Sequence, residues 1–84
     1  MSDAMAGFTE IVRETLGDPG MEVTASTTAA SVPGWDSVAM VDMIMAVEER
    51  FGIRLGSRDM DHIASVGDMV ALIERKTGKG RSAP

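Results

Sequence analysis

The pattern of apolar and polar positions predicts three amphipathic helices. In three stretches, apolar side chains recur every three or four residues, which places them on one face of a helix. The first stretch spans residues 4–16 and carries Met5, Phe8, Ile11, Val12 and Leu16. The second opens at residues 35–37, runs to residue 51 and carries Val41, Ile44, Val47 and Phe51. The third opens near residue 65 and carries Val66, Met69, Val70 and Ile73.

Capping residues bound the same three stretches. A glycine, the usual residue where a helix ends in the left-handed conformation, follows each of them, at Gly17, Gly52 and Gly78. Asp36 is the predicted N-cap of the second helix, with Trp35 and Met40 forming a hydrophobic staple around it. Ser65 and Asp68 have the spacing of a capping box at the start of the last helix.

These elements predict an all-α fold. Residues 17–33 are rich in Thr, Ser and Ala without a helical period, so we expect a long loop anchored by Met21 and Val23. Ser57 is the predicted cap of a short helix that ends near His62. No segment alternates with a period of two, so no sheet is expected. The prediction is a small four-helix bundle, with three longer helices, one short helix and a long loop between the first and second.

The charges are distributed unevenly, within a net charge of −5. All 13 acidic residues lie between Asp3 and Glu74, and four of the eight basic residues lie in the last ten positions. An acidic body disfavours nucleic acid and favours basic protein partners. The chain has no cysteine, no apolar run of membrane-spanning length and no signal-peptide pattern at its start. We therefore expect a soluble, cytoplasmic monomer without nucleic acid or membrane partners.

The sequence Gly34-Trp35-Asp36-Ser37 is the strongest candidate for a functional site. The start of a helix offers unpaired backbone N–H groups and a partial positive charge, which together suit a phosphate group. Ser37 is therefore placed to carry a phosphate-linked group, although a serine in the first turn can also serve local hydrogen bonding alone. His62 is the single histidine and lacks cysteine partners, so we predict neither a metal site nor a catalytic triad.

The chain resembles the acyl carrier proteins of the phosphopantetheine-binding family from about Phe8 to Glu74. That family has an Asp-Ser-Leu motif at the start of its second helix, and this chain has Asp36-Ser37-Val38. The family's helix ends in Glu-Glu-x-Phe, which corresponds here to Glu48-Glu49-Arg50-Phe51. The segments Gly52-Ile53-Arg54-Leu55 and Ile63-Ala64-Ser65-Val66 also fall where the family has them.

The resemblance implies a carrier protein rather than an enzyme. By it, a phosphopantetheinyl transferase esterifies Ser37 with 4′-phosphopantetheine from coenzyme A, and the terminal thiol of this arm holds an acyl group as a thioester. Asp36 is expected to repel the phosphate and keep it solvated, and we hypothesise that it helps to hold the Mg²⁺ that the transferase needs. Residues 1–76 are the expected carrier domain, and residues 77–84 are an expected polar, basic, disordered tail.

The resemblance also makes the second helix the surface for partner enzymes. The expected docking residues are two apolar and three acidic side chains: Val38, Asp42, Met45, Glu48 and Glu49. An acyl-loading ligase or synthase and downstream acyl-processing enzymes are the expected partners.

The chain departs from the common pattern of the family at several positions. Val38 replaces leucine, Ala39 stands where fatty acid carriers have an acid, and Arg54 and Arg58 lie in a region that is usually acidic. These changes favour a freestanding carrier dedicated to a specialised lipid, polyketide or other pathway over the general carrier of fatty acid biosynthesis. Two alternatives remain open at this point, an aminoacyl or peptidyl carrier and a helical interaction adaptor that is never modified.

Overall fold

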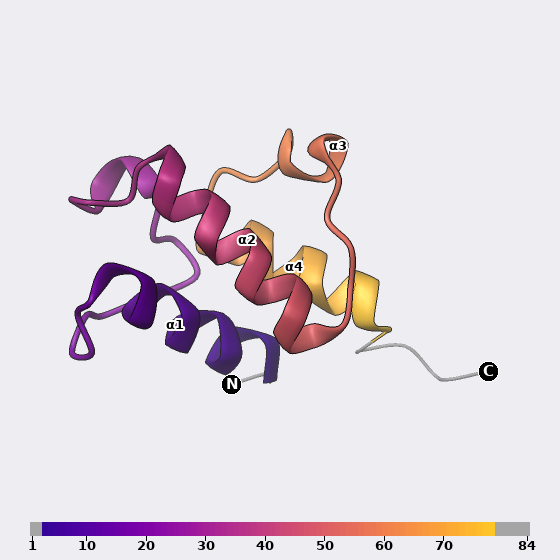
Figure 1. Ribbon diagram of the computed structural model, residues 1–84, viewed down its shortest axis with the longest axis horizontal. Helices are drawn as coiled ribbons and strands as arrows, with labels where there is room; N and C mark the ends of the chain where they lie inside the picture. Colours follow the sequence, from indigo (N-terminus) through magenta and orange to yellow (C-terminus); the bar gives the residue numbers. More distant parts are fainter. Residues whose placement is uncertain (1–2, 79–84) are drawn as a thin grey trace.

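Four α-helices and one 3-10 helix make up the computed structural model, which describes residues 3–78 (Figure 1). The elements are α1 (Asp3–Leu16), η1 (Ala29–Ser31), α2 (Ser37–Phe51), α3 (Ser57–Met60) and α4 (Val66–Thr77). No strand occurs in this described range. The all-α four-helix fold with a long loop after the first helix is therefore confirmed. The short turn η1 within that loop has no apolar period and was not predicted.

The helix ends follow from local chemistry. Gly52 ends α2 with a left-handed φ of +66°, and its N–H donates to the carbonyl of Glu48 at 2.9 Å. The capping box of α4 is confirmed, because Ser65 Oγ accepts from the Asp68 N–H at 3.3 Å and Asp68 Oδ2 accepts from the Ser65 N–H at 3.2 Å. These bonds satisfy donors that a helix start leaves unpaired.

Both predicted ends of the short helix are wrong, and so is the first residue of the predicted tail. The short helix α3 has Gly56, not Ser57, as its N-cap and ends at Met60 rather than near His62. Asp59 Oδ2 accepts from the Gly56 N–H at 2.9 Å. The start of this helix is therefore stabilised by the side chain of its third residue and not by a side chain of the N-cap residue. At the C-terminus, Gly78 is the C-cap of α4, as predicted, so Thr77 is the last residue of this helix rather than the first residue of a tail. Residues 79–84 of the predicted tail lie outside the described residues.

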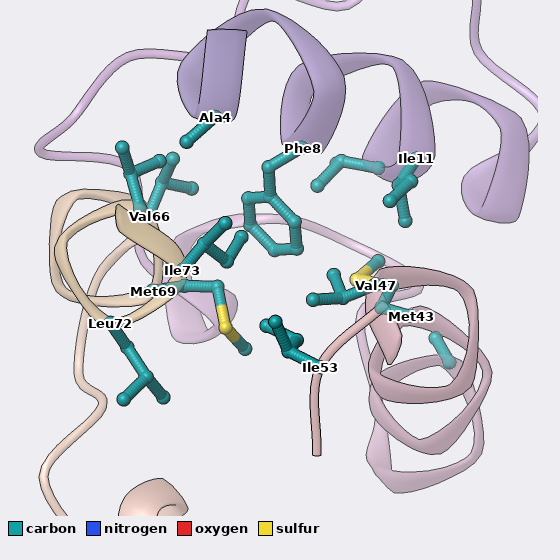
Figure 2. Close-up of a cluster of buried hydrophobic side chains, with 13 residues drawn as sticks. Ala4, Phe8, Ile11, Met43, Val47, Ile53, Val66, Met69, Leu72 and Ile73 are labelled. Carbon is teal, nitrogen blue, oxygen red and sulfur yellow. The ribbon is translucent and has the colours of Figure 1, made fainter. Parts of the chain in front are cut away.

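Phe8 lies at the centre of the core. Figure 2 shows its ring pointing from α1 into the space between α2 and α4, where Met43 and Val47 approach from α2 and Met69 and Ile73 from α4. Each of these five side chains has none of its surface exposed. The Phe8 ring of α1 is therefore packed where the three longer helices meet.

The buried face of α2 differs from the predicted one. Its buried residues are Ala39, Met43 and Val47, spaced by four. Val41 was assigned to the core, but 54% of its surface is exposed. Apolar residues occupy both faces of this helix, so the sequence offers two regular apolar stripes. Only packing against α1 and α4 decides which of the two stripes is buried.

The loop between α1 and α2 is attached to the start of α4. The Val66 N–H donates to the Thr27 carbonyl and the Gly67 N–H to the Ala25 carbonyl, both at 2.8 Å. A Cβ atom on Gly67 would lie 2.9 Å from the Ala25 oxygen, so the close approach requires glycine. The predicted anchors of the loop, Met21 and Val23, pack against the core. The loop that leads to Ser37 is thus held by backbone bonds as well as by apolar contacts.

Replacing Phe8 tests whether this core holds the fold. Phe8→Ala should lower the free energy of unfolding by about 3–5 kcal/mol, because it removes a fully buried ring. Ile73→Val in the same core should cost about 1 kcal/mol and stays measurable if the larger change unfolds the protein. Urea denaturation followed by far-UV circular dichroism gives both values. Val41→Ala, on the exposed face of α2, is the control and should change stability by less than about 0.5 kcal/mol. An Ile73→Val protein as stable as the wild type would contradict the assignment of the core.

Candidate functional site

A tight turn positions the start of α2. Gly34 has a φ of +88°, a conformation that favours glycine. The Trp35 N–H donates to the Val32 carbonyl at 3.2 Å, and the Asp36 N–H donates to the Gly34 carbonyl at 3.1 Å. The turn places Asp36 directly before the first residue of α2.

Asp36 is the N-cap of α2, as predicted. Its Oδ1 accepts a hydrogen bond from the Ala39 N–H at 2.9 Å, and its backbone carbonyl accepts from the Met40 N–H at 2.9 Å. The cap satisfies the third N–H of the helix. The first two, on Ser37 and Val38, have no acceptor within the described residues and point out of the positive end of the helix dipole.

Ser37 is the first residue of α2. Its side chain is exposed, and its hydroxyl makes no hydrogen bond with any residue that the structure describes. The hydroxyl is therefore accessible to an enzyme from outside, next to two free N–H groups and one carboxylate. This combination suits a phosphate ester attached at the surface of the protein.

Trp35 connects this site to the core. Its Nε1 donates to Met40 Sδ at 3.3 Å, so the two side chains of the predicted staple are in contact. The rings of Trp35 and Phe8 are tilted by 57° with their centroids 6.4 Å apart, a geometry typical of favourable aromatic pairs. The residue before the N-cap is thus fixed by the same ring that organises the three longer helices.

Two hollows lie next to Trp35, and Ser37 lines the outer one. An open groove of about 310 Å³ is lined by Ala29, Trp35, Asp36, Ser37 and Met40. An inner pocket shares Ala29, Trp35 and Met40 with this groove and extends to Phe8, Ile63 and Met69. The inner pocket has a volume of about 40 Å³, close to the roughly 30 Å³ that one water molecule occupies in the liquid. Most of an acyl chain could enter it only if the flexible Met40 and Met69 side chains moved.

The outer face of α2 carries an apolar stripe. Val38, Val41 and Met45 are 71%, 54% and 62% exposed, and their spacing of three and four places them on one side of the helix. Asp42 and Glu49 are exposed beside them. The exposure of Val38 and Met45 agrees with their predicted placement on the surface. Val41 belongs to the same stripe, and sequence reasoning missed it because it assigned this residue to the core.

Glu48 differs from the other acidic residues on α2. It is half-buried, and its Oε2 accepts a hydrogen bond from the Leu55 N–H at 2.8 Å. Its carboxylate therefore stabilises the connection from α2 to α3. The neighbouring Arg50 pairs with Glu10 of α1 at 2.9 Å, so its charge is directed toward α1.

Other kinds of site find no support in the described residues. No three His, Asp or Glu side chains between residues 3 and 78 converge on a position that could hold a metal ion. None of the helices in that range combines the length and apolar character needed to cross a bilayer.

Comparison with known proteins identifies the family. A family model described as a phosphopantetheine attachment site matches residues 6–73. The acyl carrier protein of Thermotoga maritima is 37% identical over 68 residues, which cover 81% of this chain and 84% of that protein. The acyl carrier protein of Exiguobacterium is 39% identical over 67 residues, which cover 80% and 85%. The meromycolate extension acyl carrier protein of Mycolicibacterium aurum is 30% identical over 73 residues, which cover 87% and 75%.

The fold agrees with this assignment. The solution structure of holo acyl carrier protein from Geobacter metallireducens superimposes with a TM-score of 0.85 at 23% identity, covering 93% of this chain and 90% of that one. Sequence and fold thus give the same answer. The chain belongs to the acyl carrier protein family, whose members are carriers rather than catalysts and hold acyl groups on covalently attached phosphopantetheine.

Proposed function

We propose that Ser37 is the residue that carries 4′-phosphopantetheine. The observation that carries this proposal is the exposed, unbonded hydroxyl on the first residue of α2, within the region matched by the phosphopantetheine attachment model. The proposed donor is coenzyme A, and the proposed loading enzyme is a phosphopantetheinyl transferase. The attached arm supplies a terminal thiol for the acyl thioester, which this cysteine-free chain lacks.

The residues around Ser37 have distinct proposed roles. The free N–H groups of Ser37 and Val38 favour a negative charge at this end of α2. Asp36 opposes that charge, because its carboxylate is exposed and lies one residue away. The balance keeps the attachment point charged and solvated rather than buried against the helix. During loading, Asp36 also helps to hold the Mg²⁺ that the transferase brings.

The outer face of α2 is the proposed docking surface for partner enzymes. It consists of Val38, Val41, Asp42, Met45 and Glu49. Three exposed apolar side chains in one stripe mark a contact surface, and the carboxylates beside them steer a basic partner. Such contacts can form quickly and separate quickly, which a carrier that visits several enzymes requires. Glu48 adds charge at the edge of this surface while its carboxylate also accepts from Leu55.

The proposed partners are an acyl-loading ligase or synthase and the acyl-processing enzymes of one dedicated pathway in the cytoplasm. Ala39, Arg54 and Arg58 make this chain less acidic than the common pattern of the family. The match to a meromycolate extension carrier, named for one lipid pathway, also favours a specialised acyl cargo. An aminoacyl or peptidyl cargo is the alternative, since the partner enzymes select what the thiol carries.

Loading of the serine is tested directly by intact mass. Incubation with coenzyme A and a broad-specificity phosphopantetheinyl transferase should add the mass of one phosphopantetheine to the wild-type chain. Ser37→Ala should gain no mass, whereas Ser31→Ala, which removes another exposed serine, should be loaded like the wild type. A wild-type chain that stays unmodified would instead favour the unmodified adaptor.

The charge and the cap of Asp36 can be separated by two substitutions. Asp36→Asn keeps an acceptor for the Ala39 N–H, so stability should stay within about 0.5 kcal/mol while the loading rate falls. Asp36→Ala also removes the cap and should cost about 1 kcal/mol in the free energy of unfolding. Loading kinetics followed by mass spectrometry and thermal unfolding give the two readouts. An unchanged loading rate for Asp36→Asn would remove Asp36 from the loading step.

Charge reversal on α2 tests the docking surface. Asp42→Lys should lower kcat/KM of the transferase for this carrier by roughly tenfold, because the carboxylate steers a basic partner. Asp18→Lys makes the same charge change at an exposed position before α2 and should have little effect. Val41→Ala, which leaves the core untouched, should also lower kcat/KM. If Asp18→Lys and Asp42→Lys are equally impaired, net charge rather than this surface decides the rate.

A further inference from the structure

The two parts of the sequence carry opposite charge. Residues 1–53 contain nine acidic and two basic residues, whereas residues 54–84 contain four acidic and six basic residues. The second part includes α3 and α4. Residues 54–78, the described part of this region, contain four acidic and four basic residues, so their charges balance, unlike those of residues 1–53.

A groove between α3 and α4 is lined by two of these basic side chains, Arg58 and Arg75. It has a volume of about 340 Å³, and its walls include Arg58 and His62 on one side and Asp68, Ala71 and Arg75 along α4. The spacing of three and four between the α4 residues places them on one face of that helix. The Lys76–Asp59 ion pair, with Nζ and Oδ2 at 2.9 Å, joins the two helices beside the groove.

Both carboxylates of the groove already have partners. Asp59 accepts from the Gly56 N–H at 2.9 Å in addition to its ion pair with Lys76. The Gly56 N–H and Lys76 lower the pKa of Asp59, because both favour its charged form. Asp68 Oδ2 accepts from the Ala64 N–H at 2.9 Å and from the Ser65 N–H at 3.2 Å. Both carboxylates are therefore bound to donors within the fold.

The two arginines of the groove are not occupied in this way. Arg58 and Arg75 are exposed, and neither guanidinium forms a hydrogen bond or an ion pair with a described residue. Arg75 lies near enough to Asp59 to favour its charged form, but without direct contact. The groove thus presents two guanidinium groups that can each bind a carboxylate in a bidentate manner.

We propose that the groove between α3 and α4 binds an acidic segment of a partner protein through Arg58 and Arg75. The segment brings at least two carboxylates, one for each guanidinium. Ala71 and the half-buried Ile63 supply apolar contact for the aliphatic parts of its side chains. The surface is separate from Ser37 and has the opposite charge preference to the docking surface on α2.

A protein segment fits the groove better than a nucleic acid or an anionic membrane does. The chain as a whole has a net charge of −5, and residues 1–53 carry nine of the 13 acidic residues. An extended polyanion or a flat anionic surface would meet these carboxylates as well as the two arginines and would be repelled. No residue of α2 lines the groove, so a short acidic segment can bind there without contacting the α2 carboxylates.

Two docking surfaces of opposite charge fix how a partner is oriented. A partner that offers basic side chains to α2 and an acidic segment to the groove gains from both only in one orientation, and the reverse orientation places like charges together. This consequence rests on the proposed docking role of α2. The groove itself does not, since its binding can be measured whether or not Ser37 is loaded.

The test uses the full chain and a hexaglutamate peptide as the probe. Titration of the ¹⁵N-labelled protein at low ionic strength should give saturable chemical-shift changes concentrated on α3 and the outer face of α4. Arg58→Gln and Arg75→Gln should each weaken binding by roughly threefold, and the double variant by roughly tenfold. Arg54→Gln makes the same charge change at an exposed position outside the groove and should bind like the wild type.

Several outcomes would overturn the proposal. Shifts that do not saturate, or that spread evenly over the protein, would show that the peptide has no defined site. An equal loss of binding for Arg54→Gln would show that net charge alone is responsible. Stronger shifts at the groove with an oligonucleotide or with phosphatidylserine vesicles than with hexaglutamate would assign the surface to a different partner. A hexalysine peptide that shifts the groove rather than α2 would also contradict it.

Discussion

The packing of Phe8 between α2 and α4 is the contact on which the rest of the structure depends. A domain of this size has few core side chains, and the Phe8 ring of α1 lies between the apolar faces of α2 and α4. Trp35 packs on the same ring, and Asp36 and Ser37 follow directly in the sequence. The position of the candidate attachment serine is therefore set by the core, although its own side chain is exposed.

The second helix combines two demands that compete for the same residues. It contributes Ala39, Met43 and Val47 to the core and still keeps Val38, Val41 and Met45 at the surface. These exposed apolar side chains lie outside the core, and the proposed docking surface on α2 rests on them. The acidic residues beside them keep this face soluble and give it an electrostatic preference.

The charged side chains that are available to a partner differ between α2 and the groove. The carboxylates on α2 are exposed, apart from Glu48, which supports the loop to α3. In the groove between α3 and α4 the situation is reversed, since Asp59 and Asp68 are bound by local donors while Arg58 and Arg75 have no partner among residues 3–78. Hydrogen bonding within the fold thus decides which charges face a partner, and the formal charge of −5 alone does not describe this.

The sequence by itself determined the three longer helices, their caps and the candidate site. Local rules suffice for these features, because Asp36, Gly52 and the Ser65–Asp68 box act within one turn of the chain. The assignment of Ser37 as the expected attachment residue came from the resemblance to the family. Tertiary structure decided which face of α2 is buried, since Val41 and Val47 are equally apolar and only the positions of α1 and α4 distinguish them. It also decided which charges are free, because the partners of Glu48, Arg50 and Asp59 lie on other elements or on backbone groups that no periodicity reveals.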